Sequence, residues 1–76
     1  SDPGLWYLLA ETQGLAGNII GLHESRAEFF ILNGNLDQAE KQLNYALELS
    51  MTKYQKSEIL YQRLKDIKDI RDRLDY

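Results

Sequence analysis

The sequence predicts an all-α protein in which four helices pack as an array of consecutive antiparallel hairpins. Two observations lead to this prediction: apolar side chains recur at three- and four-residue steps through most of the chain, and short segments with glycine or asparagine separate these runs. The expected helices span about residues 3–14, 18–33, 36–50 and 53–74. A chain of 76 residues is close to the lower limit for one hydrophobic core, so residues 1–76 are expected to form a single domain.

The start of the first expected helix is marked by Asp2 as a capping residue and Pro3 at the first helical position. The helix carries two overlapping faces, one with Leu5, Leu8, Leu9 and Thr12 and one with Trp6, Leu9, Ala10 and Gln13. We expect it to end near Gly14 or Gly17. The short link to Asn18 then makes it an antiparallel neighbour of the second helix.

The second helix is expected in the middle of the domain because apolar residues occupy two of its sides. One stripe contains Ile20, His23, Ala27, Phe30 and Ile31, and the other contains Ile19, Leu22 and Phe29. Only the sector with Glu24, Ser25 and Glu28 is expected to be fully solvated.

A tight turn at Asn33-Gly34-Asn35 joins the second and third helices. Gly34 can adopt the left-handed conformation that ends a helix, and Asn35 can cap the next one, with Gln38 three residues later. The third helix carries a narrower stripe of Ala39, Leu43, Ala46 and Leu47, so we expect one buried face and one exposed face.

The fourth helix is expected to be the longest, with Thr52 and Gln55 as a capping box. Its stripe contains Leu60, Leu64, Ile67 and Leu74, flanked by Tyr54, Ile59, Tyr61 and Ile70. Its outer face carries four pairs of opposite charge at a spacing of four, Lys65 with Asp69, Lys68 with Asp72, Asp69 with Arg73 and Arg71 with Asp75. This pattern is typical of a solvated helix that closes a stack, and the alternative is a partner-binding coiled-coil strand.

Composition excludes several classes of function. The chain has no cysteine, so it forms no disulfide and no thiolate metal site. The net charge of -3 combines an acidic segment, residues 1–52 with seven acidic and two basic side chains, and a mixed segment, residues 53–76 with five acidic and seven basic ones. That mixed segment is not a nucleic-acid footprint. The sequence contains no run of about 18 apolar residues, so we expect no membrane insertion.

The stretch His23-Glu24-Ser25-Arg26-Ala27 begins like the zinc-protease motif HExxH, in which two histidines one helical turn apart hold the metal. Ala27 replaces the second histidine, and the chain contains one histidine in total. His23 is therefore expected to be a packed residue, with no metal and no cofactor in this domain. Since we find no nucleophile with a base and no glycine-rich phosphate loop, the domain is expected not to be an enzyme.

The order of side-chain sizes in the second and third helices resembles a tetratricopeptide repeat, a helical hairpin of about 34 residues. Ala27 and Ala39 are small where the helices would cross, and Phe30 is large near the turn at Gly34. The usual closing proline is missing, since Met51 stands near its place.

Nearly the whole chain resembles the C-terminal tail of periplasmic zinc metalloproteases of the beta-barrel-assembly-enhancing (BepA-like) type. The resemblance rests on the segment around Trp6 to Ala10, on "HESRAEFF" from His23, on "NGNLDQAEKQLNYAL" from Asn33 and on the segment from Tyr54 to Leu64. It implies a non-catalytic domain of an exported protease, located in the periplasm. The implied partners are outer-membrane proteins or their assembly machinery.

The sequence is therefore interpreted as a protein-interaction module. The repeat resemblance implies an inner surface with Tyr7, Glu11, Glu24, Glu28 and Ile31. Three carboxylates there would favour basic or amide-rich extended segments, while the plainer interpretation is that these are ordinary surface glutamates. Two other functions remain open. The domain could pack on its own protease domain, or it could self-associate through Tyr45, Leu49 and Ile70, although we expect a monomer in isolation.

Overall fold

The computed structural model describes residues 2–51 and 54–75, with the side chains of Tyr54 and Gln55 left aside. It contains α1 (Pro3–Leu15), α2 (Ile19–Leu32), α3 (Leu36–Leu49) and α4 (Tyr54–Leu74), and no strand occurs among the described residues. The predicted all-α fold class is confirmed, and the observed helix bounds lie within one residue of the predicted ones.

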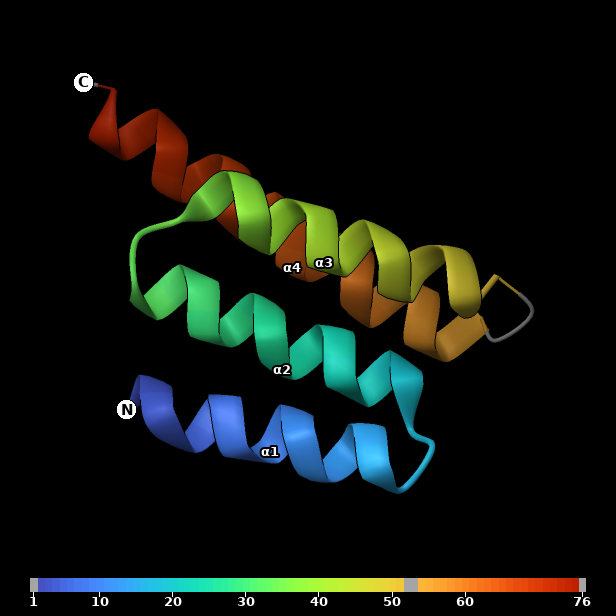
Figure 1. Cartoon of the computed structure of the whole chain (residues 1–76). Helices are drawn as coiled ribbons and strands as arrows, with labels where there is room; N and C mark the ends of the chain where they lie inside the picture. The colour runs from blue at the N-terminus through green and yellow to red at the C-terminus, as the bar shows by residue number, and fades with distance from the viewer. Residues whose placement is uncertain (1, 52–53, 76) are drawn as a thin grey trace.

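Consecutive helices lie side by side and run in alternating directions (Figure 1). In this view α1 forms one edge of the molecule, α2 lies between α1 and α3, and α4 passes behind α3 with its C-terminal end projecting beyond the other helices. The molecule measures 41 × 29 × 16 Å along its principal axes, and its smallest dimension exceeds the diameter of one helix because α4 lies behind α3. This arrangement is consistent with an array of helical hairpins.

The predicted helix boundaries arise from local hydrogen bonds. Asp2 accepts a bond from the backbone nitrogen of Gly4 at 2.8 Å, and Asn35 accepts one from that of Gln38 at 3.2 Å. Gly34 has a φ of 76°, and bonds from the nitrogen of Asn35 to Phe30 O and from that of Gly34 to Ile31 O close α2 in a Schellman motif. The turn predicted at Asn33-Gly34-Asn35 is therefore confirmed. The predicted Thr52–Gln55 capping box lies outside the described residues.

The core lies between α2, α3 and α4. Its buried members are Ala27, Leu36, Ala39, Leu43, Ala46, Leu60 and Ile67. Three alanines in this set have no exposed surface, which allows the backbones of neighbouring helices to come close. Helix α1 contributes one buried side chain of its own, Ala10, and packs against α2 at the margin of the core.

Several expectations about single residues are wrong. Ser25, predicted to be solvated, is 2% exposed, and Leu74, predicted in the buried stripe of α4, is 73% exposed because α4 projects beyond α3 at that end. Arg71 bonds to Asp37 and Glu40 of α3 instead of Asp75, since a neighbouring helix brings two carboxylates within its reach. Ile70 is half-buried against the core and is not an open apolar surface. The predicted Lys68–Asp72 pair is present at 3.0 Å.

Replacing Ala39 with leucine is expected to lower the free energy of unfolding by about 1 to 3 kcal/mol, because the larger side chain overpacks the core. Ala39 is fully buried, as predicted, so the new atoms have no route to solvent. Urea unfolding checks the value, with Lys41→Leu on the exposed side of α3 as the control. Equal stability of the two variants would contradict the packing described here.

Candidate docking groove

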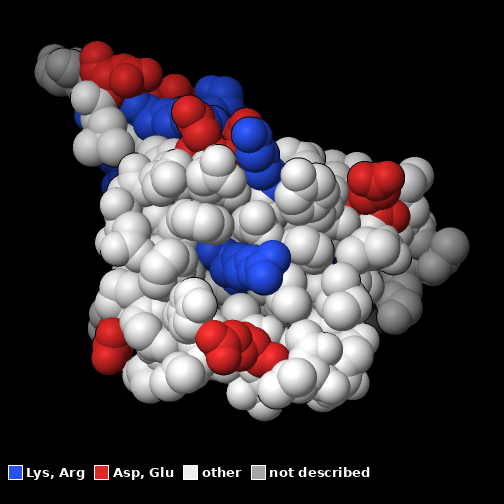
Figure 2. Space-filling model, viewed as in Figure 1, with Lys and Arg blue, Asp and Glu red and all other residues white. Residues whose placement is uncertain are grey.

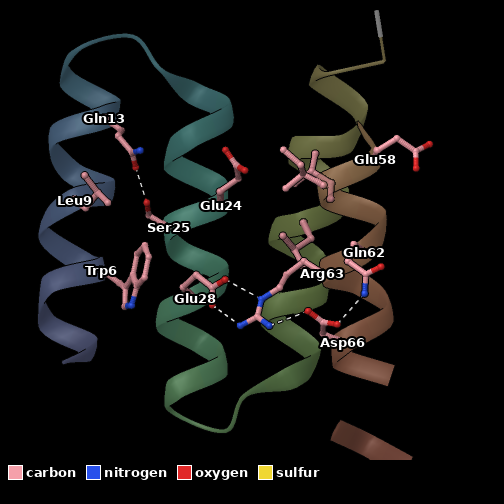
Figure 3. A pocket seen from close by; sticks show the side chains of 13 residues that line it. Trp6, Leu9, Gln13, Glu24, Ser25, Glu28, Glu58, Gln62, Arg63 and Asp66 are labelled. Carbon is pink, nitrogen blue, oxygen red and sulfur yellow. Dashed lines mark hydrogen bonds and ion pairs between the residues drawn. The ribbon is translucent and has the colours of Figure 1, made fainter. Parts of the chain in front are cut away.

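A groove of about 640 Å³ lies between α1 and α4, and side chains of α2 line its middle (Figure 3). We call it the α1–α4 groove. Helices α1 and α2 contribute Trp6, Leu9, Gln13, Glu24, Ser25 and Glu28, and helices α3 and α4 contribute Leu43, Glu58, Ile59, Leu60, Gln62, Arg63 and Asp66. Its volume lies within the range of roughly 300 to 1,000 Å³ that is typical of ligand sites.

Apolar side chains form two walls of the groove. Trp6 and Leu9 come from α1, where a spacing of three residues places them on one stripe. Ile59 stands on α4 with 57% of its surface exposed, while its neighbour Leu60 points into the core. The groove therefore presents water-exposed apolar surface on both sides.

The middle of the groove is polar and hydrogen-bonded. Ser25 Oγ lies 2.6 Å from the side-chain amide of Gln13. When the Gln13 amide nitrogen faces Ser25, it donates to Ser25 Oγ and to the carbonyl oxygen of Gly21 at 2.8 Å. This orientation satisfies more hydrogen-bonding groups than the reverse one. A Cβ atom at Gly21 would come within 2.5 Å of the side-chain amide of Asn18 and within 2.7 Å of that of Gln13, so both amides would have to shift to accommodate a larger residue.

Ion pairs connect α2 and α4 along the groove. Glu28 accepts two bonds from Arg63, from Nη2 at 2.7 Å and from Nε at 2.8 Å, and Arg63 Nη1 lies 3.1 Å from Asp66. Lys56 Nζ lies 3.2 Å from Glu24. The fork of the guanidinium matches the carboxylate, so the Glu28–Arg63 contact fixes orientation as well as charge.

These contacts also shift protonation equilibria. The hydrogen bond with Glu28 raises the pKa of Arg63, and a smaller contribution comes from Asp66. Bonds from Gln62 and then from Arg63 lower the pKa of Asp66, so this carboxylate stays charged to lower pH than an isolated aspartate. Four carboxylates line the groove, against the guanidinium of Arg63 and the ammonium of Lys56, which is paired with Glu24. The groove therefore keeps an acidic excess.

The five residues predicted as one inner surface are divided among three places. Glu24 and Glu28 line the α1–α4 groove. They had been expected to be fully solvated, but each forms an ion pair with a residue of α4. Tyr7 and Glu11 line a separate hollow of about 140 Å³, where the Tyr7 ring lies 5.8 Å from that of Phe29.

Ile31 packs on the core and lines neither hollow. On α1 the stripe with Trp6, Leu9 and Gln13 faces the groove, and Tyr7 and Glu11 lie on the neighbouring stripe. The structure therefore does not bring the five residues together in one hollow, and protein binding at any of them stays a prediction.

Sequence reasoning missed most of the groove. Trp6, Leu9 and Gln13 were recognised as a face of α1, but their neighbours on α4 lie more than 40 residues away in the chain. The available signal was opposite charge, since α2 offers Glu24 and Glu28 and α4 offers Lys56 and Arg63.

His23 is half-buried beside α3. Its Nδ1 atom lies 2.7 Å from Gln42 Oε1, and its ring centroid lies 5.3 Å from that of Tyr45. Within residues 2–51 and 54–75, no three histidine or carboxylate side chains converge as a metal site would require. The neighbours of His23 are thus those of a packed, hydrogen-bonded histidine.

Comparison of the chain with protein-family models, curated proteins and solved structures gave no match. Among the described residues, each helix is too short or too polar to cross a membrane.

Proposed function

We propose that this chain is a non-catalytic protein-interaction module that holds a segment of another protein in the α1–α4 groove. The observation that carries the proposal is the composition of the groove, with exposed apolar walls around a polar middle and a charged border. Protein interfaces combine an apolar centre with a polar rim in the same way. Trp6, an aromatic side chain in a concave place, is the kind of residue that dominates binding energy.

The ion pairs make Glu28 and Glu24 better suited to join two helices than to act as general bases. A general base needs a carboxylate oxygen free to accept a proton from a substrate. Both oxygens of Glu28 already accept bonds from Arg63, and Glu24 is paired with Lys56. These two pairs connect α2 to α4, the helices on which the groove depends.

The acidic excess of the groove favours a basic or amide-rich segment of the partner. By the resemblance to BepA-like proteases, the proposed location is the periplasm and the proposed partners are outer-membrane proteins or their assembly machinery. The parent protein would be a zinc metalloprotease, with this domain outside its catalytic part. Packing of the groove on that protease domain is the second arrangement that the same surface supports.

The test uses the full-length parent protein in its native host, with a photo-crosslinking amino acid at position 59 or at position 61. Ile59 lines the groove, whereas Tyr61, which is exposed to a similar degree on the same helix, does not. We expect crosslinks to another protein from position 59, and few from position 61. The variant Ile59→Asp should weaken binding of that protein at least about tenfold, with Tyr61→Asp as the matched control.

Other outcomes would decide against the proposal. Crosslinks from position 59 within the same molecule would favour the structural arrangement, and crosslinks between two copies would favour self-association. Equal labelling from both positions, or none, would mean that the groove is not the docking surface.

A further inference from the structure

The helices of this protein form one complete layer and part of a second. Helices α1, α2 and α3 lie side by side, and α4 passes behind α3 (Figure 1). The ion pairs of Glu24 with Lys56 and of Glu28 with Arg63 hold α4 to α2 as well. On this side of the layer, no helix of the described chain covers α1 and the adjoining part of α2. The α1–α4 groove lies at that place.

The groove has the dimensions of one short helix. Packed helices lie about 8 to 10 Å apart, so α1 and α3, which flank α2, are separated by roughly 16 to 20 Å. This leaves room beside α4 for about one more helix, since a helix with its side chains measures about 10 Å across. The lining residues run from Trp6 to Gln13 on α1 and from Glu58 to Asp66 on α4, about 10 to 12 Å at a rise of about 1.5 Å per residue. About two turns of helix fill that length.

Apolar side chains face this place from two directions. Trp6 and Leu9 form the wall on α1, and Ile59 forms the wall on α4. The wall on α1 continues past the groove, because Trp6 and Leu9 also line an adjoining hollow of about 360 Å³ together with Leu5 and Asp2. A helix that lies between two walls needs a wide apolar face, with apolar residues at positions i, i+3, i+4 and i+7.

The apolar wall on α4 is short. Beyond Asp66, the exposed residues of α4 are Lys68, Asp69, Asp72, Arg73 and Leu74. Figure 2 shows charged side chains crowded where Figure 1 places the C-terminal half of α4. Alternating charges of this kind are typical of a helix surface that faces solvent. The apolar docking surface therefore ends near Asp66, which limits an added helix to about two to three turns.

The polar groups of the groove favour a helix over an extended segment. Ser25 is hydrogen-bonded to Gln13, and Gln62 Nε2 donates to Asp66 Oδ1 at 3.1 Å, so these side chains are already engaged. The walls are helices, whose backbone groups are bonded within each helix. An extended segment would find few partners here for its backbone N–H and C=O groups, whereas a helix satisfies its own.

The charges of the groove select the sign of the partner. The carboxylates that line it are Glu24, Glu28, Glu58 and Asp66. The cations beside them, Arg63 and Lys56, are both engaged in ion pairs with α2. Glu58 is exposed and has no ion-pair partner within residues 2–51 and 54–75. A partner with lysine or arginine at the border of its apolar face complements this acidic excess, and one with glutamate there is repelled.

We propose that the occupant of the α1–α4 groove is an amphipathic helix of about two to three turns, with a wide apolar face bordered by lysine or arginine. The apolar residues of this helix pack between Trp6 and Ile59, and its basic residues lie beside Glu58. The inference rests on the proposed function, because it names the kind of segment that the groove binds.

Three synthetic peptides without tryptophan test this proposal on the 76-residue chain. The first is a helix held by a side-chain staple on its outer side, with leucines at positions i, i+3, i+4 and i+7 and lysine beside them. The second carries glutamate in place of lysine. The third contains the residues of the first in an order that alternates leucine with polar residues, and it has no staple. Trp6 is the single tryptophan of the chain and lines the groove, so its fluorescence reports occupation of the groove.

We expect the lysine helix to shift the emission of Trp6 in a saturable manner, and the other two peptides to bind at least about tenfold more weakly. Leu9→Asp and Ile59→Asp should each weaken binding of the lysine helix at least about tenfold. The matched controls are Leu8→Asp on α1 and Tyr61→Asp on α4, which replace exposed residues outside the groove and should leave binding unchanged. Circular dichroism checks that each variant keeps its helices.

The remaining outcomes separate this inference from the proposed function. Tighter binding of the alternating peptide, with loss of that binding in Ile59→Asp, would overturn the helix and keep the groove as a docking site. No binding of any peptide would overturn the helix as well, and the absence of crosslinks from position 59 would then overturn the proposed function too. Equal binding of the lysine and glutamate helices, or binding that survives both Leu9→Asp and Ile59→Asp, would contradict the proposed contacts. A dimer that dissociates in Ile59→Asp would assign the groove to a second copy of the chain instead.

Discussion

Truncation of Leu43 to alanine is expected to lower the free energy of unfolding by about 2 to 5 kcal/mol. Leu43 is 2% exposed and contributes to the core as well as to the base of the α1–α4 groove. Its removal leaves a cavity among helices α2, α3 and α4, and the surrounding side chains can fill only part of it. For a domain with a total stability of about 5 to 10 kcal/mol, this is a large loss.

Urea unfolding followed by circular dichroism measures the effect. Leu49→Ala is the matched control, since Leu49 lies on the same helix with about half of its surface exposed, and we expect it to change stability by about 0.5 kcal/mol or less. Similar losses for both variants would contradict the core described above.

Truncation of Leu60 to alanine is expected to lower the free energy of unfolding by a similar amount, about 2 to 5 kcal/mol. Unlike the Leu43 truncation, it should destabilise α4 before the other helices. Among the described side chains of α4, Leu60 and Ile67 are the buried ones that join the core. Because α4 lies at the edge of the core and its C-terminal end projects freely, loss of Leu60 should detach this helix before the α2–α3 hairpin unfolds.

Hydrogen exchange resolves that order. In Leu60→Ala, amides of α4 should exchange faster than in the unmodified protein, and by a larger factor than amides of α2. The control is Ile59→Ala, one residue earlier on the exposed side, which should leave the pattern unchanged. Uniform acceleration across all helices would mean that α4 and the hairpin unfold as one unit.

The hairpin of α2 and α3 could be predicted from the sequence because short-range contacts define it. Gly34 and Asn35 determine the turn within a few residues, and the predicted burial of Ala39 at the helix crossing agrees with the structure. Helix periodicity is likewise local, which explains why the bounds of all four helices were predicted closely.

The groove could not be predicted in the same way, because it depends on where α4 lies against α2. Glu28 and Arg63 are 35 residues apart, and their spacing along the chain gives no indication of the contact. The burial of Ser25 has the same origin, since its partner Gln13 comes from another helix. Ser25 was predicted to be solvated because it shares a sector of the helix with Glu24 and Glu28. Its exposure is determined instead by the residues that pack against it in space.

The apolar faces of α1 illustrate another limit. Periodicity correctly identified two faces, but the structure uses the one that contains Ala10 and leaves Leu5 and Leu8 uncovered. A stripe of leucines indicates that a helix can bury a face. It does not indicate whether the covering element belongs to the same chain.

The ion pairs of α4 make the shape of the groove sensitive to ionic strength. Arg63 connects the middle of α4 to α2, and Arg71 connects the end of α4 to α3, while Leu60 and Ile67 provide the apolar attachment between and beside them. Added salt screens the exposed charges and leaves the apolar contacts in place. We therefore expect α4 to roll more freely about its leucine and isoleucine contacts in concentrated salt, so that the distance between the two walls of the groove varies while the fold persists.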